Sequence, residues 1–243
     1  MFVQRLTSVH ERIARACRRT GRSPSRVALL AVTKTVPAQA VREAIAAGIA
    51  DIGESRVQEA RDKQAELADA VVRWHLIGHL QRNKAATAAR LFDAVHSLDS
   101  AELAADLNAA RASGPKSQRL EVFIQVALAG EAQKFGCSPE AALKLAEKIP
   151  DWPHLRLVGL MTIPPYQDDP EAARPVFKLL YQLRAEAGKR TGMAPTALKL
   201  SMGMSHDFEV AIEEGADIVR VGTALFGARS ENTGENSENN ENN

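Results

Sequence analysis

The first apolar run of the sequence ends in a lysine, Lys34, and has the sequence LLAVTK over residues 29–34. At the end of a strand an ammonium group is partly withdrawn from water, which together with nearby cations lowers the pKa of a lysine from about 10.4 toward about 7–8. A lysine in this state is a nucleophile for aldehydes. The alternative is a lysine whose stem lies on the strand while its ammonium group reaches water. Lys34 alone leaves both interpretations open.

Two glycine-containing segments near the end of the chain have the residue types of a phosphate site. They are SMGMS, residues 201–205, and RVGTALFG, residues 220–227. Gly203 and Gly222 allow the backbone to approach an anion closely, and Ser201 and Thr223 offer hydroxyl groups. Each segment alone has a plainer interpretation, with Ser205 as a helix N-cap and Gly222 in a tight turn. Together the two segments predict a phosphate cup.

A lysine nucleophile and a phosphate cup suit a phosphorylated aldehyde, of which pyridoxal 5′-phosphate (PLP) is the commonest biological example. Arg220 would then determine the electronic state of the cofactor ring. An arginine stays protonated and can only donate a hydrogen bond, so it suits a neutral pyridine nitrogen, and a ring in that state stabilises carbanions poorly. The alternative is a structural arginine paired with an acid at the rim of the fold.

Strand ends must converge to bring these side chains together, and the sequence alternates short apolar runs with longer amphipathic stretches. We expect strands at Val27–Lys34, Ala50–Gly53, Val72–Gly78, Ala94–Leu98, Leu120–Leu128, Leu155–Ile163, Leu198–Met202 and Asp217–Gly222. We expect helices at Met1–Arg19, Pro37–Ala47, Val57–Ala70, Asn83–Leu91, Ser100–Ala112, Ser138–Ile149, Asp169–Lys189 and Ser205–Glu214. Their apolar positions have the helical period.

Alternation of strand and helix predicts a parallel sheet, because parallel neighbours need a crossover connection. Eight such units predict one α/β domain, a (β/α)₈ TIM-type barrel over residues 1–229 with an extra N-terminal helix. The alternative is an open doubly wound sheet, but no G-x-G-x-x-G motif follows the first strand. From Ser230 onward the chain is acidic and rich in asparagine without an apolar residue, so we expect residues 230–243 to be disordered.

Composition and charge exclude several classes of partner. The chain has 243 residues, 45% of them apolar, and a net charge of +1, which favours a globular protein without affinity for nucleic acid or anionic lipid. It contains no run of about 20 apolar residues, so we expect no membrane helix. Cys17 and Cys137 lack metal-ligand spacing and are typical of a reducing compartment, the cytoplasm. His75 and His79 lack the H-E-x-x-H pattern, so we expect no metal site.

Six segments of the chain, in a fixed order, match one family pattern. They are LAVTK at 30–34, GESRVQE at 53–59, WHLIGHLQRNK at 74–84, GLM at 159–161, LSMGMSHD at 200–207 and VRVGTALFG at 219–227. With them the sequence resembles the pyridoxal phosphate homeostasis protein family, PLP-binding relatives of the alanine racemase N-terminal barrel. The resemblance covers Met1 to Arg229 and leaves out the acidic tail.

The resemblance implies a site in which Lys34 holds PLP as a Schiff base, Arg220 faces the pyridine nitrogen and three residues surround the phosphate. These three are Ser201, Gly222 and Thr223. The remaining members of the implied cofactor site are Ser55, Met161 and Met202.

Two positions depart from the family pattern. The usual Gly-Glu-Asn after the second strand is Gly53-Glu54-Ser55 here, and Ala127 stands where an asparagine is common in the loop after the fifth strand. Neither position belongs to the phosphate cup or replaces the lysine, so the resemblance still implies PLP binding.

The resemblance implies a role in vitamin B6 and amino-acid homeostasis, as a PLP carrier and not an enzyme. Its expected partners are PLP, free amino acids and PLP-requiring apoenzymes, and we expect a monomer and not a dimer. The alternative is a PLP-dependent racemase-like enzyme. Barrel racemases take a second base, a tyrosine, from an additional β-domain of the partner subunit, and we expect no such domain here. Tyr166, in the loop after the sixth predicted strand, is the tyrosine placed to reach the mouth of the barrel.

Overall fold

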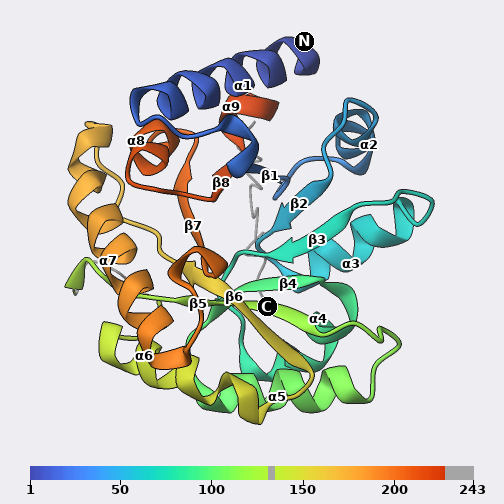
Figure 1. Cartoon of the computed structure of the whole chain (residues 1–243). Helices are drawn as coiled ribbons and strands as arrows, with labels where there is room; N and C mark the ends of the chain where they lie inside the picture. Colours follow the sequence, from blue (N-terminus) through green and yellow to red (C-terminus); the bar gives the residue numbers. More distant parts are fainter. Residues whose placement is uncertain (131–134, 228–243) are drawn as a thin grey trace, which may run out of the picture.

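Eight parallel strands pair in sequence order, and the last pairs with the first, which closes the sheet into a barrel (Figure 1). The computed structural model describes residues 1–130 and 135–227. The strands are β1 Ala28–Val32, β2 Asp51–Glu54, β3 Arg73–Leu76, β4 Ala94–Leu98, β5 Leu120–Gln125, β6 Leu155–Met161, β7 Lys199–Met204 and β8 Ile218–Val221. The predicted TIM-type barrel is therefore confirmed. The predicted tail beyond Ser230 lies outside the described residues.

The helices form a ring outside the strands (Figure 1). They are α1 Phe2–Arg19, α2 Ala38–Ala46, α3 Val57–Glu66, α4 Ala85–Leu91, α5 Ala101–Ala112, α6 Pro139–Lys148, α7 Arg174–Thr191, α8 Phe208–Glu213 and α9 Thr223–Phe226. Ser100 and Ser138 cap α5 and α6, since each hydroxyl accepts a backbone N–H of the first turn at 3.3 Å. Ser205 is not a cap, because α8 begins only at Phe208.

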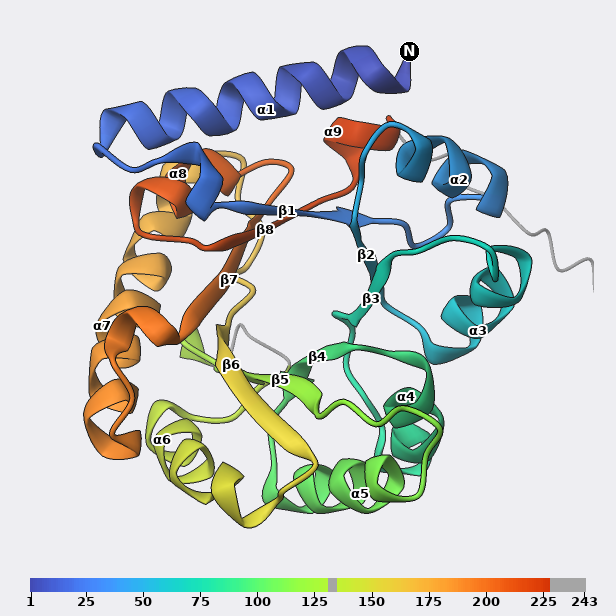
Figure 2. The same cartoon turned by 45° about the vertical axis from the view of Figure 1, so that its right-hand side comes forward.

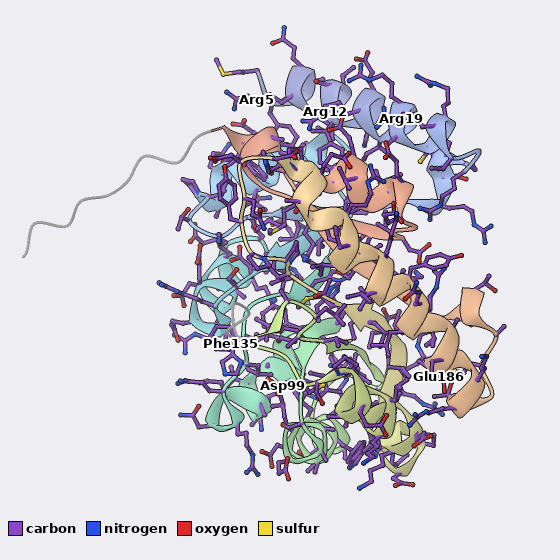
Figure 3. The ribbon with its side chains drawn as sticks, turned by 90° about the vertical axis from the view of Figure 1, so that its left-hand side faces the viewer. Arg5, Arg12, Arg19, Asp99, Phe135 and Glu186 are labelled. Atoms are coloured by element: carbon purple, nitrogen blue, oxygen red, sulfur yellow. The ribbon has the colours of Figure 1, made fainter. Side chains whose placement is uncertain are left out.

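Helix α1 lies across α8 and α9 (Figure 2). Arg5, Arg12 and Arg19 follow one another at intervals of seven residues along it (Figure 3). Arg12 contacts Glu209 at 2.8 Å and Arg19 contacts Glu213 at 2.5 Å, both on α8. The additional N-terminal helix therefore braces the two helices that follow β7 and β8.

The hydrophobic side chains form two separate clusters. The larger cluster, the outer layer, lies outside the barrel, between the strands and the helices, and the smaller cluster, the inner layer, lies inside the barrel, where residues of opposite strands pack together. The inner layer consists of Leu30, Phe123, Val158, Met161 and Ile218. Within residues 1–130 and 135–227, no helix is long and apolar enough to cross a membrane.

Candidate cofactor site

Lys34 lies in a tight turn directly after β1, at the carboxyl end of the barrel. The turn is closed by a hydrogen bond of 2.9 Å from Val36 N to the carbonyl oxygen of Thr33. Thr35 has a φ of 62°, and it is the only non-glycine residue with positive φ among those described. This conformation costs about 1–2 kcal/mol for an L-residue, and such strain concentrates at functional sites. Glu59 Oε1 accepts the Thr35 N–H at 2.5 Å and holds the turn.

A buried ion cluster supports the turn from outside the barrel. Lys63 Nζ, on α3, donates to the carbonyl oxygen of Thr33 at 2.5 Å and contacts Glu54 and Glu59 at 2.7 Å each. Glu54 is fully buried, and burial raises its pKa against the hydrogen bonds from Lys63 and Thr33. Sequence analysis missed Lys63. Its spacing of four residues from Glu59 on a predicted helix was the available signal.

The loops after β7 and β8 bring two backbone N–H groups onto one oxygen. Gly222 N and Ala224 N donate to Ser205 Oγ at 3.1 and 3.3 Å. Both N–H groups belong to the first residues of α9 or its cap, where an anion is favoured. The Thr223 side chain is exposed beside them. Ser205 therefore links the two loops that carry Gly222 and Thr223, two of the three residues predicted to surround the phosphate.

Gly203 allows β7 and α8 to approach each other closely. Its φ is 91°, and a Cβ at this position would lie 2.5 Å from the Cβ of Ala211 and 2.9 Å from the Cα of Phe208. Any side chain here would push α8 away from the strand. The sequence predicts that Gly203 lets the backbone approach an anion, and the structure gives it a packing role, because the lack of a side chain fixes α8 against the strand next to the loop that carries Ser205.

Arg220 lies inside the barrel and is 3% exposed. Its Nη1 donates to the carbonyl and hydroxyl oxygens of Ser201 at 2.7 and 2.8 Å, and its Nη2 donates to the carbonyl oxygen of Thr162 at 2.8 Å. Arg220 Nε has no acceptor among the described residues. Burial lowers the pKa of Arg220 to about 10, opposed by the negative charge of Asp207. Arg220 forms no ion pair within the described chain, unlike the structural alternative expected for it.

The structure separates Ser201 from Met202, because neighbouring strand residues face opposite sides of the sheet. Ser201 points inward, where its hydroxyl meets Arg220 and His96, and Met202 packs in the outer layer against the helices. Met161 lies in the inner layer. Ser55 lines a separate pocket of about 420 Å³ on the loops after β2 and β3.

Two histidines that had no expected partner meet inside the barrel. His75 Nδ1 and His96 Nε2 lie 3.0 Å apart, and His96 Nδ1 lies 2.9 Å from Ser201 Oγ. The sequence spacing between His75 and His96 gave no signal, because β3 and β4 contribute one residue each. His79 lies apart from them and stacks on Phe135, with ring centroids 4.4 Å apart.

Comparisons with known proteins identify the family. Residues 5–230 match the family model described as alanine racemase, N-terminal domain. Relatives from Pseudomonas aeruginosa and Aquifex aeolicus, both named pyridoxal phosphate homeostasis protein, are 47% and 44% identical to this chain. These alignments cover 94% and 93% of this chain and 96% and 97% of the relatives.

Solved structures give the same result. PipY of Synechococcus elongatus has a TM-score of 0.81 and 36% identity without PLP, and a TM-score of 0.80 and 35% identity with PLP bound. Both comparisons cover 93% of this chain and 100% of PipY. An alanine racemase from Clostridium difficile, at 13% identity and a TM-score of 0.67, shares the fold. The chain belongs to the family of pyridoxal phosphate homeostasis proteins.

Proposed function

We propose that this chain binds PLP, held covalently at Lys34, and acts in PLP homeostasis as a carrier and not an enzyme. The relatives named as homeostasis proteins and the PLP-bound PipY structure support the cofactor. Arg220, the loops after β7 and β8, and Lys34 support the position of the cofactor.

Arg220 is the observation that carries the proposal. Its two terminal nitrogens are used by protein oxygens, whereas Nε–H has no acceptor in the part of the chain that the structure describes. A donor of a largely buried side chain that no protein acceptor uses is available to a ligand. A pyridine nitrogen is an acceptor of the kind that this N–H lacks. With a pKa of about 10, Arg220 remains protonated at neutral pH and donates without giving up its proton.

The loops after β7 and β8 suit the phosphate. Gly222 N and Ala224 N already converge on an oxygen, that of Ser205, and the exposed Thr223 hydroxyl adds a further donor. Two N–H groups at a helix start and two hydroxyls form a donor set suited to a dianion. We therefore propose Ser205 as a phosphate contact. We assign Ser201 to the orientation of Arg220, because its hydroxyl lies inside the barrel between Arg220 and His96.

Lys34 supplies the attachment point at the same end of the barrel. Its turn is fixed by Glu59 and by the buried Lys63, so its amine is presented from a rigid backbone. Bound PLP offers an aldehyde to amines and an electron sink to carbanions, and the second property needs a protonated ring nitrogen. Arg220 does not supply that proton. This chain's residues thus favour holding and releasing the cofactor over catalysis.

The racemase-like alternative depends on Tyr166. This side chain is 74% exposed and its ring centroid lies 5.3 Å from that of His206, on the loop after β7. Apart from this tilted ring contact with His206, no described residue contacts the exposed phenol in a way that would hold it as a base. We therefore propose that Tyr166 is not a catalytic residue, and that a Tyr166→Phe variant exchanges the α-proton of L-alanine in heavy water no more slowly than the native protein.

The proposal is tested by trapping the cofactor. Purified protein incubated with PLP should show an absorbance band at the edge of the visible range that borohydride removes, and peptide mapping should place the reduced adduct on Lys34. Lys34→Ala should lose the adduct and keep its fold. Lys189→Ala, which removes an exposed lysine of α7 on the outside of the barrel, is the control and should keep it. An adduct on another lysine, or one that survives in Lys34→Ala, would contradict the assignment.

A further inference from the structure

Five polar side chains inside the barrel form a continuous hydrogen-bonded chain, one from each of five strands. Arg220 Nη1 lies 2.8 Å from Ser201 Oγ, which lies 2.9 Å from His96 Nδ1. His96 Nε2 lies 3.0 Å from His75 Nδ1, and His75 Nε2 lies 2.8 Å from Asp51 Oδ1. The first four residues are at most 3% exposed. A buried chain of this length is a specific structural feature, because each unpaired member would be costly.

The far end of the chain lies at the opposite end of the barrel from Lys34. Asp51 is the first residue of β2, and with His75 it lines a small cavity of about 40 Å³. The other charged residues of this cavity are Arg73 of β3, Glu121 of β5 and Lys199 of β7. Arg73 lies 3.8 Å from Asp51 and 2.6 Å from Glu121. The charged side chains at this end of the barrel therefore act on the hydrogen-bonded series through Asp51.

The two ends fix the direction of every hydrogen bond between them. An arginine only donates, so Ser201 Oγ accepts from Arg220 and its own proton goes to His96 Nδ1. Neutral His96 then carries its proton on Nε2 and donates to His75 Nδ1. His75 carries its proton on Nε2 and donates to the Asp51 carboxylate. Every donor thus points from Arg220 toward Asp51, and each of the four hydrogen bonds between Arg220 and Asp51 has one donor and one acceptor.

The opposite direction leaves a group unpaired. If neutral His75 carried its proton on Nδ1, it would donate a hydrogen bond to His96 Nε2. His96 would then carry its own proton on Nδ1 and donate to Ser201 Oγ. The Ser201 hydroxyl would then have no acceptor among the described residues, which costs about 1–3 kcal/mol.

Electrostatics support the same direction. Burial is the main cause that holds the pKa of His96 well below its usual 6.5, and the positive charge of Arg220 lowers it further, so His96 is neutral. Burial raises the pKa of Asp51, but the hydrogen bond from His75 and the nearby cations outweigh it, so the net pKa is lowered and Asp51 is ionised. A neutral imidazole and a carboxylate are the two states that this direction requires.

We propose that Ser201, His96, His75 and Asp51 form a one-way hydrogen-bond relay that positions Arg220 from the far end of the barrel. Asp51, His75 and His96 are thus positioning residues for the cofactor ring, and charge at Asp51 influences the hydrogen bond offered to the pyridine nitrogen. This inference rests on the proposed function, because it takes Arg220 as the partner of that nitrogen.

The first experiment examines the relay without PLP. Nitrogen-15 NMR of the two imidazoles in the full-length protein at pH 7.5 should show both His75 and His96 as neutral rings protonated on Nε2. Asp51→Asn should shift the His96 nitrogen resonances, although the substituted side chain does not touch that ring, and His154→Gln, at an exposed histidine, should not. A His96 proton on Nδ1 in the native protein, or His96 resonances unchanged in Asp51→Asn, would overturn the relay.

The second experiment tests the link to the cofactor. Asp51→Asn should weaken PLP and pyridoxal equally, by about three- to tenfold, because the disturbed contact is at the ring and not at the phosphate. The 1-deaza analogue of PLP, which has carbon in place of the pyridine nitrogen, should bind the variant and the native protein equally. Equal weakening of the deaza analogue, or no weakening of PLP, would overturn the link to Arg220.

Failure of the relay and failure of the proposed function are distinguishable. If the native protein binds no PLP, the proposed function is wrong, and so is the link between the relay and the cofactor. The NMR experiment tests the direction of the relay independently of PLP. Should Asp51→Asn unfold, His96→Phe provides the second variant. This substitution keeps the stacking on Phe123, where the ring centroids are 4.1 Å apart, but removes both ring nitrogens. It should change the ratio of PLP to deaza-PLP affinity as Asp51→Asn is expected to.

Discussion

Lys63 Nζ lies 2.5 Å from the carbonyl oxygen of Thr33, the residue that precedes Lys34. Lys63 is 6% exposed, and the carboxyl group of Glu54 beside it is fully buried. Lys63 belongs to α3, the helix that follows the next strand, so the turn after β1 is fixed by its neighbouring βα unit. The position of the cofactor lysine therefore depends on a residue that does not touch the cofactor.

Lys63→Met should destabilise the protein by about 3–5 kcal/mol at pH 8, because removing one partner leaves the Glu54 carboxylate buried without its counter-ion. The pKa of Glu54, already raised by burial, should rise further. A carboxyl group whose pKa is raised on folding stabilises the folded state at pH values below its ordinary pKa near 4.5. This contribution to the free energy of unfolding is lost as the pH rises through the folded-state pKa. The loss should thus be larger at pH 8 than at pH 5.

Urea unfolding at the two pH values measures this effect. Arg61→Met on the same helix is the control, because Arg61 is 57% exposed and its pair with Asp62 is open to water. A loss for Lys63→Met no larger than for this control would show that the buried cluster does not stabilise the turn.

Gly203→Ala should destabilise the protein by about 2–4 kcal/mol and weaken PLP binding. The new Cβ would lie 2.5 Å from the Cβ of Ala211, so α8 must shift, and overpacking of this kind costs about 1–3 kcal/mol beyond the strain of positive φ. Gly48→Ala is the matched control, since its φ of 99° is similar and no atom lies within 4 Å. The difference in thermal stability between the two variants measures the steric part of the destabilisation. Equal losses would mean that α8 moves freely.

Local patterns in the sequence were sufficient for the barrel and for part of the site. Strand and helix alternate along the described residues, and Lys34, Gly222 and Thr223 are found where apolar runs end, so the rule that function lies at strand ends predicts them as site residues. That rule does not say which way a strand residue points. Ser201 and Met202 are both compatible with either side of β7, and only the packing of the closed barrel turns Ser201 inward and Met202 outward.

Long-range polar contacts had no signal in the sequence. Ser201 and His96 are 105 residues apart, and His96 and His75 are 21 apart. Each residue is a single polar position within a strand, and such a position is compatible with many partners before the strands are placed. Ser205 also gave a misleading signal, because a serine before a helix is typical of an N-cap. In the structure it instead joins the loops after β7 and β8.

Ser205→Ala combined with Thr223→Val should weaken PLP by about 100-fold or more and leave pyridoxal unchanged. Each hydrogen bond to a charged phosphate is worth about 1.5–3 kcal/mol, and pyridoxal has no phosphate with which to form it. Isothermal titration with both ligands provides the comparison. Parallel losses for the two ligands would place the phosphate elsewhere.

His96 should make the protein sensitive to acid. Its pKa in the folded state is well below the 6.5 of a free imidazole, because the ring is buried and faces His75 and the Arg220 charge. Below pH 6.5 the unfolded chain therefore binds a proton at this position that the folded protein refuses. Since the unfolded state then binds more protons, the free energy of unfolding falls as the pH falls, by up to about 1.4 kcal/mol per pH unit from this residue. Above pH 6.5 the contribution is constant.

His96→Asn removes this titration, and the amide oxygen can still accept the Ser201 hydroxyl. The variant should be less stable than the native protein at pH 7.5, because it loses the contact to His75. The difference should shrink as the pH is lowered toward 5. Urea unfolding curves at half-unit steps from pH 7.5 to 5 measure the difference, and His154→Asn, at an exposed histidine, should follow the native curve throughout. A difference that stays constant down to pH 5 would mean that His96 is protonated as readily in the folded barrel as in water, and the direction assigned to its hydrogen bonds would then be wrong.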